Sequence, residues 1–258
     1  MATEGNVASQ LGAVALVGSG EYTDAMNETD RHLIATLGGP ANARVALLPT
    51  ASGLEPDSPK YWNDLGMRHF TSLGVADIRP TWILDAQTAH DPAQLDLLRG
   101  ANFYYFSGGN PQHVISSMRG SPAWEIISAA YANGAVLAGC SAGAMAMSGY
   151  TLSLRFAFSG SGPVEFVESL AVVPHVIVFP HFDRILGRMG SAALRTRLVK
   201  APQGAIPIGV DEDTALVRIA LPNPDGKALW RVMGRQTVTI FWPGAAHQVL
   251  HTGDEVAL

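Results

Sequence analysis

Short apolar segments that end in small or turn-forming residues recur along the first half of the chain. They are residues 13–17 before Gly18-Ser19-Gly20, 45–48 before Pro49-Thr50-Ala51-Ser52, 103–106 before Ser107-Gly108-Gly109-Asn110, and 135–138 before Gly139-Cys140-Ser141. Continuous apolar runs of this length are typical of strands buried on both faces, as in a parallel sheet. Segments with helical spacing lie between them, at residues 31–37, 62–73 and 122–133. The alternation predicts a doubly wound, mostly parallel α/β sheet flanked by helices.

The last third of the chain has a different pattern, which predicts a β-rich C-terminal extension. Residues 208–211 resemble another strand, and 214–219 are expected to pair with 230–232 around the turn at 222–226. Residues 236–241 and 248–250 are further strand candidates. Because no linker separates this extension from the sheet, we expect one domain over residues 1–258.

The composition narrows the class of protein. The chain has 258 residues, 47% of them hydrophobic and 15% charged, with a net charge of −5 and no basic stripe, which argues against disorder and against nucleic-acid binding. Without a signal-like start or an apolar run of about 20 residues, a soluble, cytoplasmic protein without membrane contact is expected. No nucleic-acid partner is therefore predicted, and a homodimer is compatible with the sequence.

Neither a cofactor nor a metal is expected. Gly18-Ser19-Gly20 lacks the third glycine of a dinucleotide fingerprint, and the chain has no phosphate-binding loop. His175, His181 and Asp183 lack the compact spacing of a metal site.

A nucleophile elbow is predicted at Gly139-Cys140-Ser141-Ala142-Gly143, a G-x-S-x-G pattern after a buried strand and before good helix formers. A serine on such a sharp turn needs small neighbours, and the N–H of Ala142 would help to hold an oxyanion. The pentapeptide alone also fits an ordinary small-residue turn. Cys140 is a rival nucleophile, which we interpret instead as a small buried residue.

A serine nucleophile needs a base, an acid and an oxyanion hole. Among the eight histidines, His181 follows the expected strand 176–179, and His113 follows the Ser107–Asn110 turn, so either is able to approach the site. One of Asp211, Glu212 and Asp213 is a candidate to orient the base, and Gly108-Gly109 amides are candidates for the oxyanion hole.

Taken together, these motifs resemble those of peptidase family S51, the dipeptidase E and cyanophycinase group. The matching segments run in the family's order from residue 16 to about 217. They are Leu16-Val17-Gly18-Ser19-Gly20-Glu21, Leu47-Leu48-Pro49-Thr50-Ala51-Ser52, Phe106-Ser107-Gly108-Gly109-Asn110, Gly139-Cys140-Ser141-Ala142-Gly143-Ala144, Pro180-His181-Phe182 and Ile208-Gly209-Val210-Asp211-Glu212-Asp213-Thr214-Ala215. The resemblance implies a class I glutamine amidotransferase-like fold without cofactor.

For the site, the resemblance implies Ser141 as nucleophile, His181 as general base and Glu212 as the acid. Gly109 and Ala142 would then form the oxyanion hole, with Gly108 and Asn110 among the substrate-binding residues.

The resemblance also implies hydrolysis of small peptides at aspartyl residues through an acyl-enzyme. Cyanophycinases have Asp-Gln before the catalytic histidine, whereas this chain has Phe179-Pro180, which favours the dipeptidase E type. Arg184 and Arg188 are candidate partners for an aspartyl carboxylate, or else members of a solvated basic helix face.

Three alternatives to the dipeptidase E type stay open. The first is a cyanophycinase-like β-aspartyl peptidase. The second is an esterase of the α/β-hydrolase type that uses Ser141, Asp211 or Asp213, and His247. The third is a non-catalytic protein with an amidotransferase-like scaffold.

Overall fold

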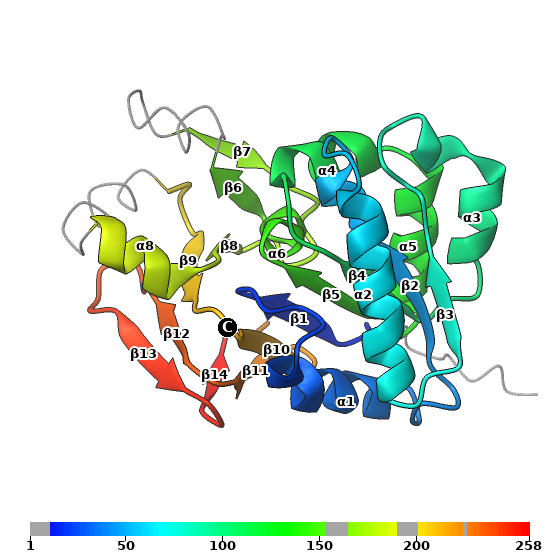
Figure 1. The fold of residues 1–258 in the computed structure, drawn as a ribbon. Coiled ribbons are helices and arrows are strands. Elements are labelled where there is room, and N and C mark those ends of the chain that lie inside the picture. The colour runs from blue at the N-terminus through cyan, green and yellow to red at the C-terminus, as the bar shows by residue number, and fades with distance from the viewer. Residues whose placement is uncertain (1–10, 153–164, 190–200, 224–225) are drawn as a thin grey trace, which may run out of the picture.

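The computed structural model describes residues 11–152, 165–189, 201–223 and 226–258 (Figure 1). Its centre is an eight-stranded sheet with the order β14-β11-β10-β1-β5-β4-β2-β3. The five parallel strands are β1 (Val14–Val17), β2 (Arg44–Leu48), β3 (Asp77–Pro80), β4 (Phe103–Phe106) and β5 (Val136–Cys140). The antiparallel strands β10 (Thr214–Ala220), β11 (Leu229–Gly234) and β14 (Glu255–Ala257) extend the sheet beyond β1. The predicted α/β class is confirmed.

Helices cover both faces of this sheet, as a doubly wound fold requires. The helices α1 (Asn27–Thr36) and α2 (Ser58–Ser72) bury apolar side chains in the core on one face. The other face is covered by α3 (Pro92–Leu98), α4 (Pro111–Met118), α5 (Pro122–Ala132) and α6 (Ala142–Met147). Short 3-10 helices η1 (Asp24–Met26), η2 (Pro49–Ser52) and η3 (Thr88–His90) complete the connections. The central strands β1, β4 and β5 are buried along their whole length, as their apolar runs predict.

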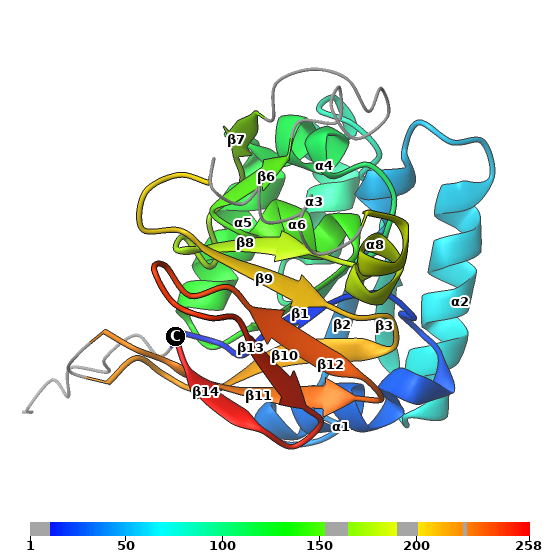
Figure 2. The same ribbon diagram turned by 90° about the vertical axis from the view of Figure 1, so that its left-hand side faces the viewer.

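A second, four-stranded sheet has the order β13-β12-β9-β8, and Figure 2 faces it. Its strands are β8 (Val176–Phe179), β9 (Ile206–Val210), β12 (Thr237–Ile240) and β13 (Gln248–His251). Val178, Ile208 and Ile240 share the core that α3 to α6 form against the main sheet. The helix α8 (Phe182–Met189) follows β8, and β6 (Tyr150–Leu152) pairs with β7 (Phe166–Glu168) as a separate two-stranded sheet.

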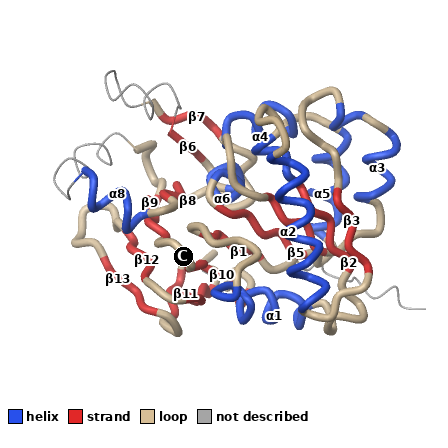
Figure 3. Tube along the Cα trace, viewed as in Figure 1, coloured by secondary structure: helices blue, strands red, loops and turns tan. Residues whose placement is uncertain are grey.

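The C-terminal region corrects one expectation from the sequence. The predicted pairing of residues 214–219 with 230–232 is present as β10 and β11. The apolar run at residues 176–179 is present as the strand β8, but β8 and β9 belong to the second sheet and not to the predicted doubly wound sheet; Figure 3 shows the strands of both sheets in red. The chain passes from the second sheet to the main sheet at residues 211–213. The strand before this segment, β9, pairs with β8, and the strand after it, β10, pairs with β1.

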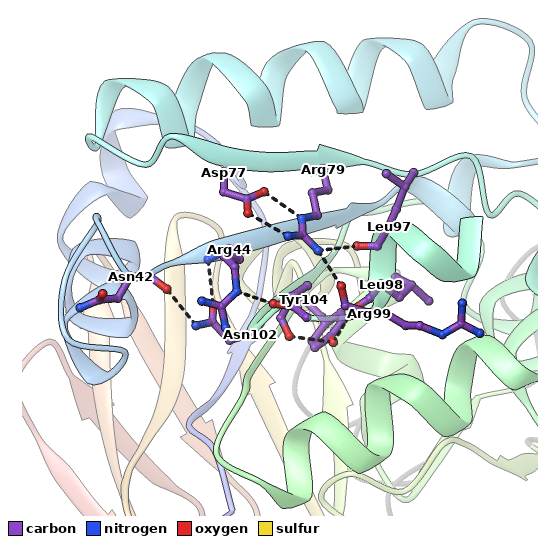
Figure 4. A network of polar contacts seen from close by, with 11 residues as sticks. Asn42, Arg44, Asp77, Arg79, Leu97, Leu98, Arg99, Asn102 and Tyr104 are labelled. Atoms are coloured by element: carbon purple, nitrogen blue, oxygen red, sulfur yellow. Dashed lines mark hydrogen bonds and ion pairs between the residues drawn. The ribbon is translucent and has the colours of Figure 1, made fainter. Parts of the chain in front are cut away.

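Polar side chains close the amino-terminal edge of the parallel strands (Figure 4). Arg79 donates to both carboxylate oxygens of Asp77 at 2.8 Å and to the carbonyl oxygen of Arg99 at 2.7 Å. The buried hydroxyl of Tyr104 lies 2.9 Å from the carbonyl oxygens of both Leu98 and Ala101. These contacts attach the end of α3 and the loop after it to the strands, because they satisfy carbonyl groups that a helix end leaves without partners.

A cap residue defines where α5, the helix before the elbow, begins. The side chain of Ser121 accepts a hydrogen bond from the N–H of Trp124 at 3.1 Å, and Pro122 is the first residue of α5. Within the described residues, no helix is long and apolar enough to cross a bilayer.

Candidate active site

Ser141 occupies the sharp turn between β5 and α6. Its backbone has φ 50° and ψ −107°, which is a strained conformation for a residue other than glycine. The N–H of Ser141 donates to the carbonyl oxygen of Val17 at 2.9 Å, so the end of β1 holds the turn in place. A Cβ atom at Gly139 would lie 2.5 Å from the carbonyl carbon of Gly143, and a Cβ at Gly143 would lie 2.5 Å from the carbonyl oxygen of Phe106. The two glycines of the elbow are therefore required by packing.

His181 lies directly after β8 and faces the serine. The distance between Ser141 Oγ and His181 Nε2 is 3.0 Å, which is a hydrogen bond. His181 has a positive φ of 50°, the same φ as Ser141, and it lies in the turn that follows a strand of the second sheet. The side chain is 41% exposed, which leaves room for a substrate beside it.

Glu212 orients the imidazole from the opposite side. Its Oε1 atom lies 2.9 Å from His181 Nδ1, and its Oε2 atom accepts hydrogen bonds from Arg184 Nε at 3.1 Å. The hydrogen bond with His181 lowers the pKa of Glu212, and the nearby guanidinium of Arg184 lowers it further. The backbone N–H of Glu212 donates to Asp183 Oδ1 at 3.1 Å, so α8 also fixes the turn that carries the acid.

The two neighbouring acids have other partners. Asp211 is buried and accepts hydrogen bonds from the hydroxyl and the N–H of Thr237, at 2.6 and 3.1 Å. Asp213 lies 3.8 Å from a guanidinium nitrogen of Arg235. Of the three consecutive acids, the structure brings Glu212 to the histidine.

The other histidines considered from the sequence lie elsewhere. His113 Nε2 is 2.6 Å from the carbonyl oxygen of Leu84, at the start of α4. His247 stacks on Phe241 at a centroid distance of 5.8 Å, in the loop before β13. Because Ser141 Oγ makes its hydrogen bond with His181 Nε2, the geometry does not support the triad with His247. Among the described residues, no group of three or more His, Cys, Asp or Glu side chains is arranged to hold a metal ion.

The turn after β4 contributes backbone groups beside the serine. Gly109 has φ 140°, and a Cβ there would lie 2.4 Å from the carbonyl oxygen of Ala51. Within the described part of the chain, the N–H groups of Gly109 and Ala142 donate to no protein acceptor, whereas the N–H of Gly108 donates to Glu21 Oε1 at 2.9 Å. Of the two glycine amides considered for an oxyanion hole, the one of Gly108 is therefore already in use.

The candidate substrate-binding residues have structural partners. Asn110 caps α4, because its side chain accepts from the N–H of His113 at 3.1 Å. The predicted clamp residue Arg184 is paired with Glu212, where its terminal nitrogen lies 2.9 Å from Oε2. Arg188 lies near the end of α8, where its side chain is outside the described residues. Gly108 lies next to the nucleophile, since a Cβ there would be 3.5 Å from the Cβ of Ser141.

Glu21 is a site residue to which the sequence interpretation gave no role. It follows β1, is 6% exposed, and accepts a hydrogen bond from the Cys140 thiol at 2.7 Å as well as that from Gly108. Burial raises the pKa of Cys140 well above its usual value, and the neighbouring Glu21 raises it further. Cys140 is therefore a buried thiol behind the elbow, in line with its interpretation as a packing residue. The available signal was an acidic residue at the end of a buried strand, after Gly18-Ser19-Gly20.

A strained serine on a strand-to-helix turn, hydrogen-bonded to an imidazole that a carboxylate orients, is the site of an α/β protein built for nucleophilic chemistry. The model of peptidase family S51 matches residues 14–220. The chain belongs to peptidase family S51 and is a hydrolase of the peptidase class.

Solved structures agree with this assignment. A peptidase from an acI-B1 Actinobacterium is 30% identical, with a TM-score of 0.80, over 97% of this chain and 98% of the other. A putative peptidase E protein from Listeria monocytogenes EGD-e shares the fold at 15% identity, with a TM-score of 0.55, over 95% of this chain and 100% of the other. None of the curated proteins compared with the chain matches it.

Proposed function

We propose that the protein is a serine peptidase that cleaves small aspartyl-containing peptides, in the manner of dipeptidase E. The observation that carries the proposal is the continuous hydrogen-bonded row from Ser141 Oγ through His181 to Glu212, with distances of 3.0 and 2.9 Å. Membership of family S51 supports peptide hydrolysis.

In this mechanism, Ser141 Oγ attacks the scissile carbonyl carbon while His181 Nε2 accepts its proton. Glu212 accepts the hydrogen bond from Nδ1–H, which holds the imidazole in the tautomer that accepts at Nε2. The carbonyl oxygen becomes an oxyanion, to which the N–H groups of Gly109 and Ala142 would donate hydrogen bonds. His181 then protonates the leaving amine, and an acyl-enzyme on Ser141 remains. Water, activated by the same histidine, releases the acid product.

The aspartyl preference rests on the family resemblance and on Phe179-Pro180 before the histidine. The ion pair of Arg184 with Glu212 gives this arginine a role in the triad. We therefore assign Arg184 no contact with the aspartyl carboxylate of the substrate.

The test is hydrolysis of N-terminal Asp-X dipeptides, isoaspartyl dipeptides and β-aspartyl-arginine by the wild type, Ser141→Ala, His181→Ala and Glu212→Gln. We expect turnover of Asp-X, a loss of kcat of about 10⁴-fold or more in the serine and histidine variants, and a smaller loss in Glu212→Gln. Cys140→Ala is the matched control for the nucleophile and is expected to keep labelling by a fluorophosphonate at Ser141. Preference for β-aspartyl-arginine would select the cyanophycinase-like reaction. No labelling of folded wild-type protein would refute the serine mechanism.

A further inference from the structure

The carboxyl group of Glu21 is buried behind the nucleophile, and the mechanism above does not use it. One of its oxygens accepts the N–H of Gly108 at 2.9 Å and the other accepts the thiol of Cys140 at 2.7 Å. Each partner immediately precedes a residue of the proposed chemistry in the sequence: Gly108 precedes Gly109, and Cys140 precedes Ser141.

The strand ladder does not reach these two turns. The pairing of β4 with β5 ends at Phe106 opposite Gly139, so the segments that follow have lost their direct backbone connection. Glu21 joins the two segments beyond the last paired residues, because its carboxyl group has two oxygens and each accepts a hydrogen bond from one segment. The segment that follows a third strand, β1, thus supplies the link between the turns after β4 and β5.

We propose that Glu21 is a positioning residue that sets the geometry between the oxyanion donor Gly109 N–H and the nucleophile Ser141. This inference rests on the proposed serine mechanism. With its N–H bound to Glu21, Gly108 is fixed at the serine, and the peptide group that presents the N–H of Gly109 is held with it.

The close fit around Glu21 supports a positioning role. A Cβ added at Gly108 would lie 3.1 Å from Glu21 Oε1 and 3.5 Å from the Cβ of Ser141, so Gly108 lies close to both side chains. A donor that leaves the oxyanion position by about 1 Å loses much of its effect, and loss of one donor lowers kcat by about 10²–10³-fold. Truncation of Glu21 is therefore expected to act on the transition state more than on substrate binding.

The experiment compares Glu21→Ala and Glu21→Gln with the wild type, by kcat and KM on the preferred peptide and by the rate constant of fluorophosphonate labelling of Ser141. We expect Glu21→Ala to lower kcat and the labelling rate constant about 10²-fold, with KM within about threefold. Glutamine keeps an acceptor for the N–H of Gly108 but loses the acceptor for the thiol. Glu21→Gln is therefore expected to restore most of the rate, with a remaining loss of about three- to tenfold.

Asp30 provides the matched control. It is a carboxyl group at least as buried as Glu21, its side chain is hydrogen-bonded to His69 at 2.7 Å, and it makes no hydrogen bond to either described turn of the site. Asp30→Ala is expected to lower the melting temperature while kcat of the folded protein stays within about twofold of the wild type, because cost to stability alone does not move the donors.

The outcomes separate the two proposals. If Ser141 of the wild type is not labelled, the serine mechanism is wrong. If the wild type is labelled and folded Glu21→Ala has the wild-type kcat and labelling rate, the positioning role is wrong. If Glu21→Ala does not fold, Glu21→Gln decides: a loss of kcat of threefold or more at constant KM supports the role, and a wild-type kcat overturns it.

Discussion

The two edges of the parallel sheet carry polar networks of different kinds. At the amino-terminal edge, Arg79 and Tyr104 donate mainly to backbone carbonyl groups of the α3 end (Figure 4). At the carboxyl-terminal edge, Ser141, His181 and Glu212 are joined by hydrogen bonds between side chains, and the first two have positive φ angles.

The difference shows that contacts which stabilise the fold and groups which carry out chemistry lie at opposite edges of the parallel strands. Donors that satisfy helix-end carbonyl groups lower the free energy of the folded state and offer no reactive group. The carboxyl edge instead keeps strained residues and half-exposed polar groups, which the folded state tolerates because buried strands hold the turns on both sides. Changes at the amino-terminal edge should therefore alter stability and leave the rate of hydrolysis intact.

The largest effect is expected for Ser141→Gly. Hydrolysis should fall by about 10⁴-fold or more, because the nucleophile is lost. The free energy of unfolding should rise by about 1 kcal/mol, because glycine adopts the φ of 50° without the strain that serine bears. Denaturant unfolding and peptide hydrolysis measure the two effects. Ser141→Ala is the control, inactive but still strained, and equal stability of the two variants would contradict the strain argument.

An intermediate effect is expected for Tyr104→Phe at the amino-terminal edge. The loss of the hydroxyl leaves the carbonyl groups of Leu98 and Ala101 without this donor, which should lower the free energy of unfolding by about 1–2 kcal/mol. Hydrolysis by the folded protein should be unchanged.

The next residue supplies the control for this change. Tyr105 lies on the other face of β4, and its buried hydroxyl has no partner among the described residues. Tyr105→Phe should therefore cost no stability, because it removes a polar group that makes no hydrogen bond. Equal destabilisation by the two changes would show that the amino-edge hydrogen bonds contribute nothing.

The smallest effect is expected for Arg184→Gln. Its side chain is 64% exposed, so its ion pair with Glu212 is screened, and kcat should fall only about two- to fivefold at constant KM. Arg231→Gln, which removes another ion pair of an arginine with a glutamate, is the control without a rate effect. A tenfold rise of KM for aspartyl peptides alone would instead assign Arg184 to substrate binding.

The same variant has a pH signature. The pKa of Glu212 is lowered by His181 first and by Arg184 second. Its contribution to stability is therefore present above the unfolded pKa of about 4.3 and is lost as the pH falls through the lower folded value. Without Arg184 the folded pKa lies closer to the unfolded value, so this stabilisation should be smaller and its loss complete at a higher pH, which denaturant unfolding between pH 7 and pH 3 would show.

The sequence predicts those parts of the fold that depend on local pattern. Runs such as Phe103–Phe106 are apolar throughout, so β4 is recognisable, and packing around the elbow demands the glycines at 139 and 143. The edge strand Asp77–Pro80 has no such run, because it is only half-buried and begins with polar residues that serve the amino-edge network.

The local residue pattern does not predict which distant segments come into contact. Val176–Phe179 has the same apolar character as the strands of the main sheet, so periodicity does not tell which sheet it joins. The residue pattern alone left Asp211, Glu212 and Asp213 as alternatives for the acid. The structure distinguishes them through a distant contact, because Asp211 accepts a hydrogen bond from Thr237. Glu21 had no assigned role because its partners lie 87 and 119 residues away.

The crossing of the chain between the sheets at residues 211–213 also bears on how activity arises during folding. Glu212 reaches His181 only where β9 ends, and the same turn starts β10, whose Ala215 pairs with Val17 near the beginning of the chain. Pairings of such high sequence separation form slowly, because the closure of a long loop precedes any gain from contacts. We therefore expect a growing or half-folded chain to hold the serine before the acid that orients its base is in place, so that hydrolysis begins only after β10 has paired with β1.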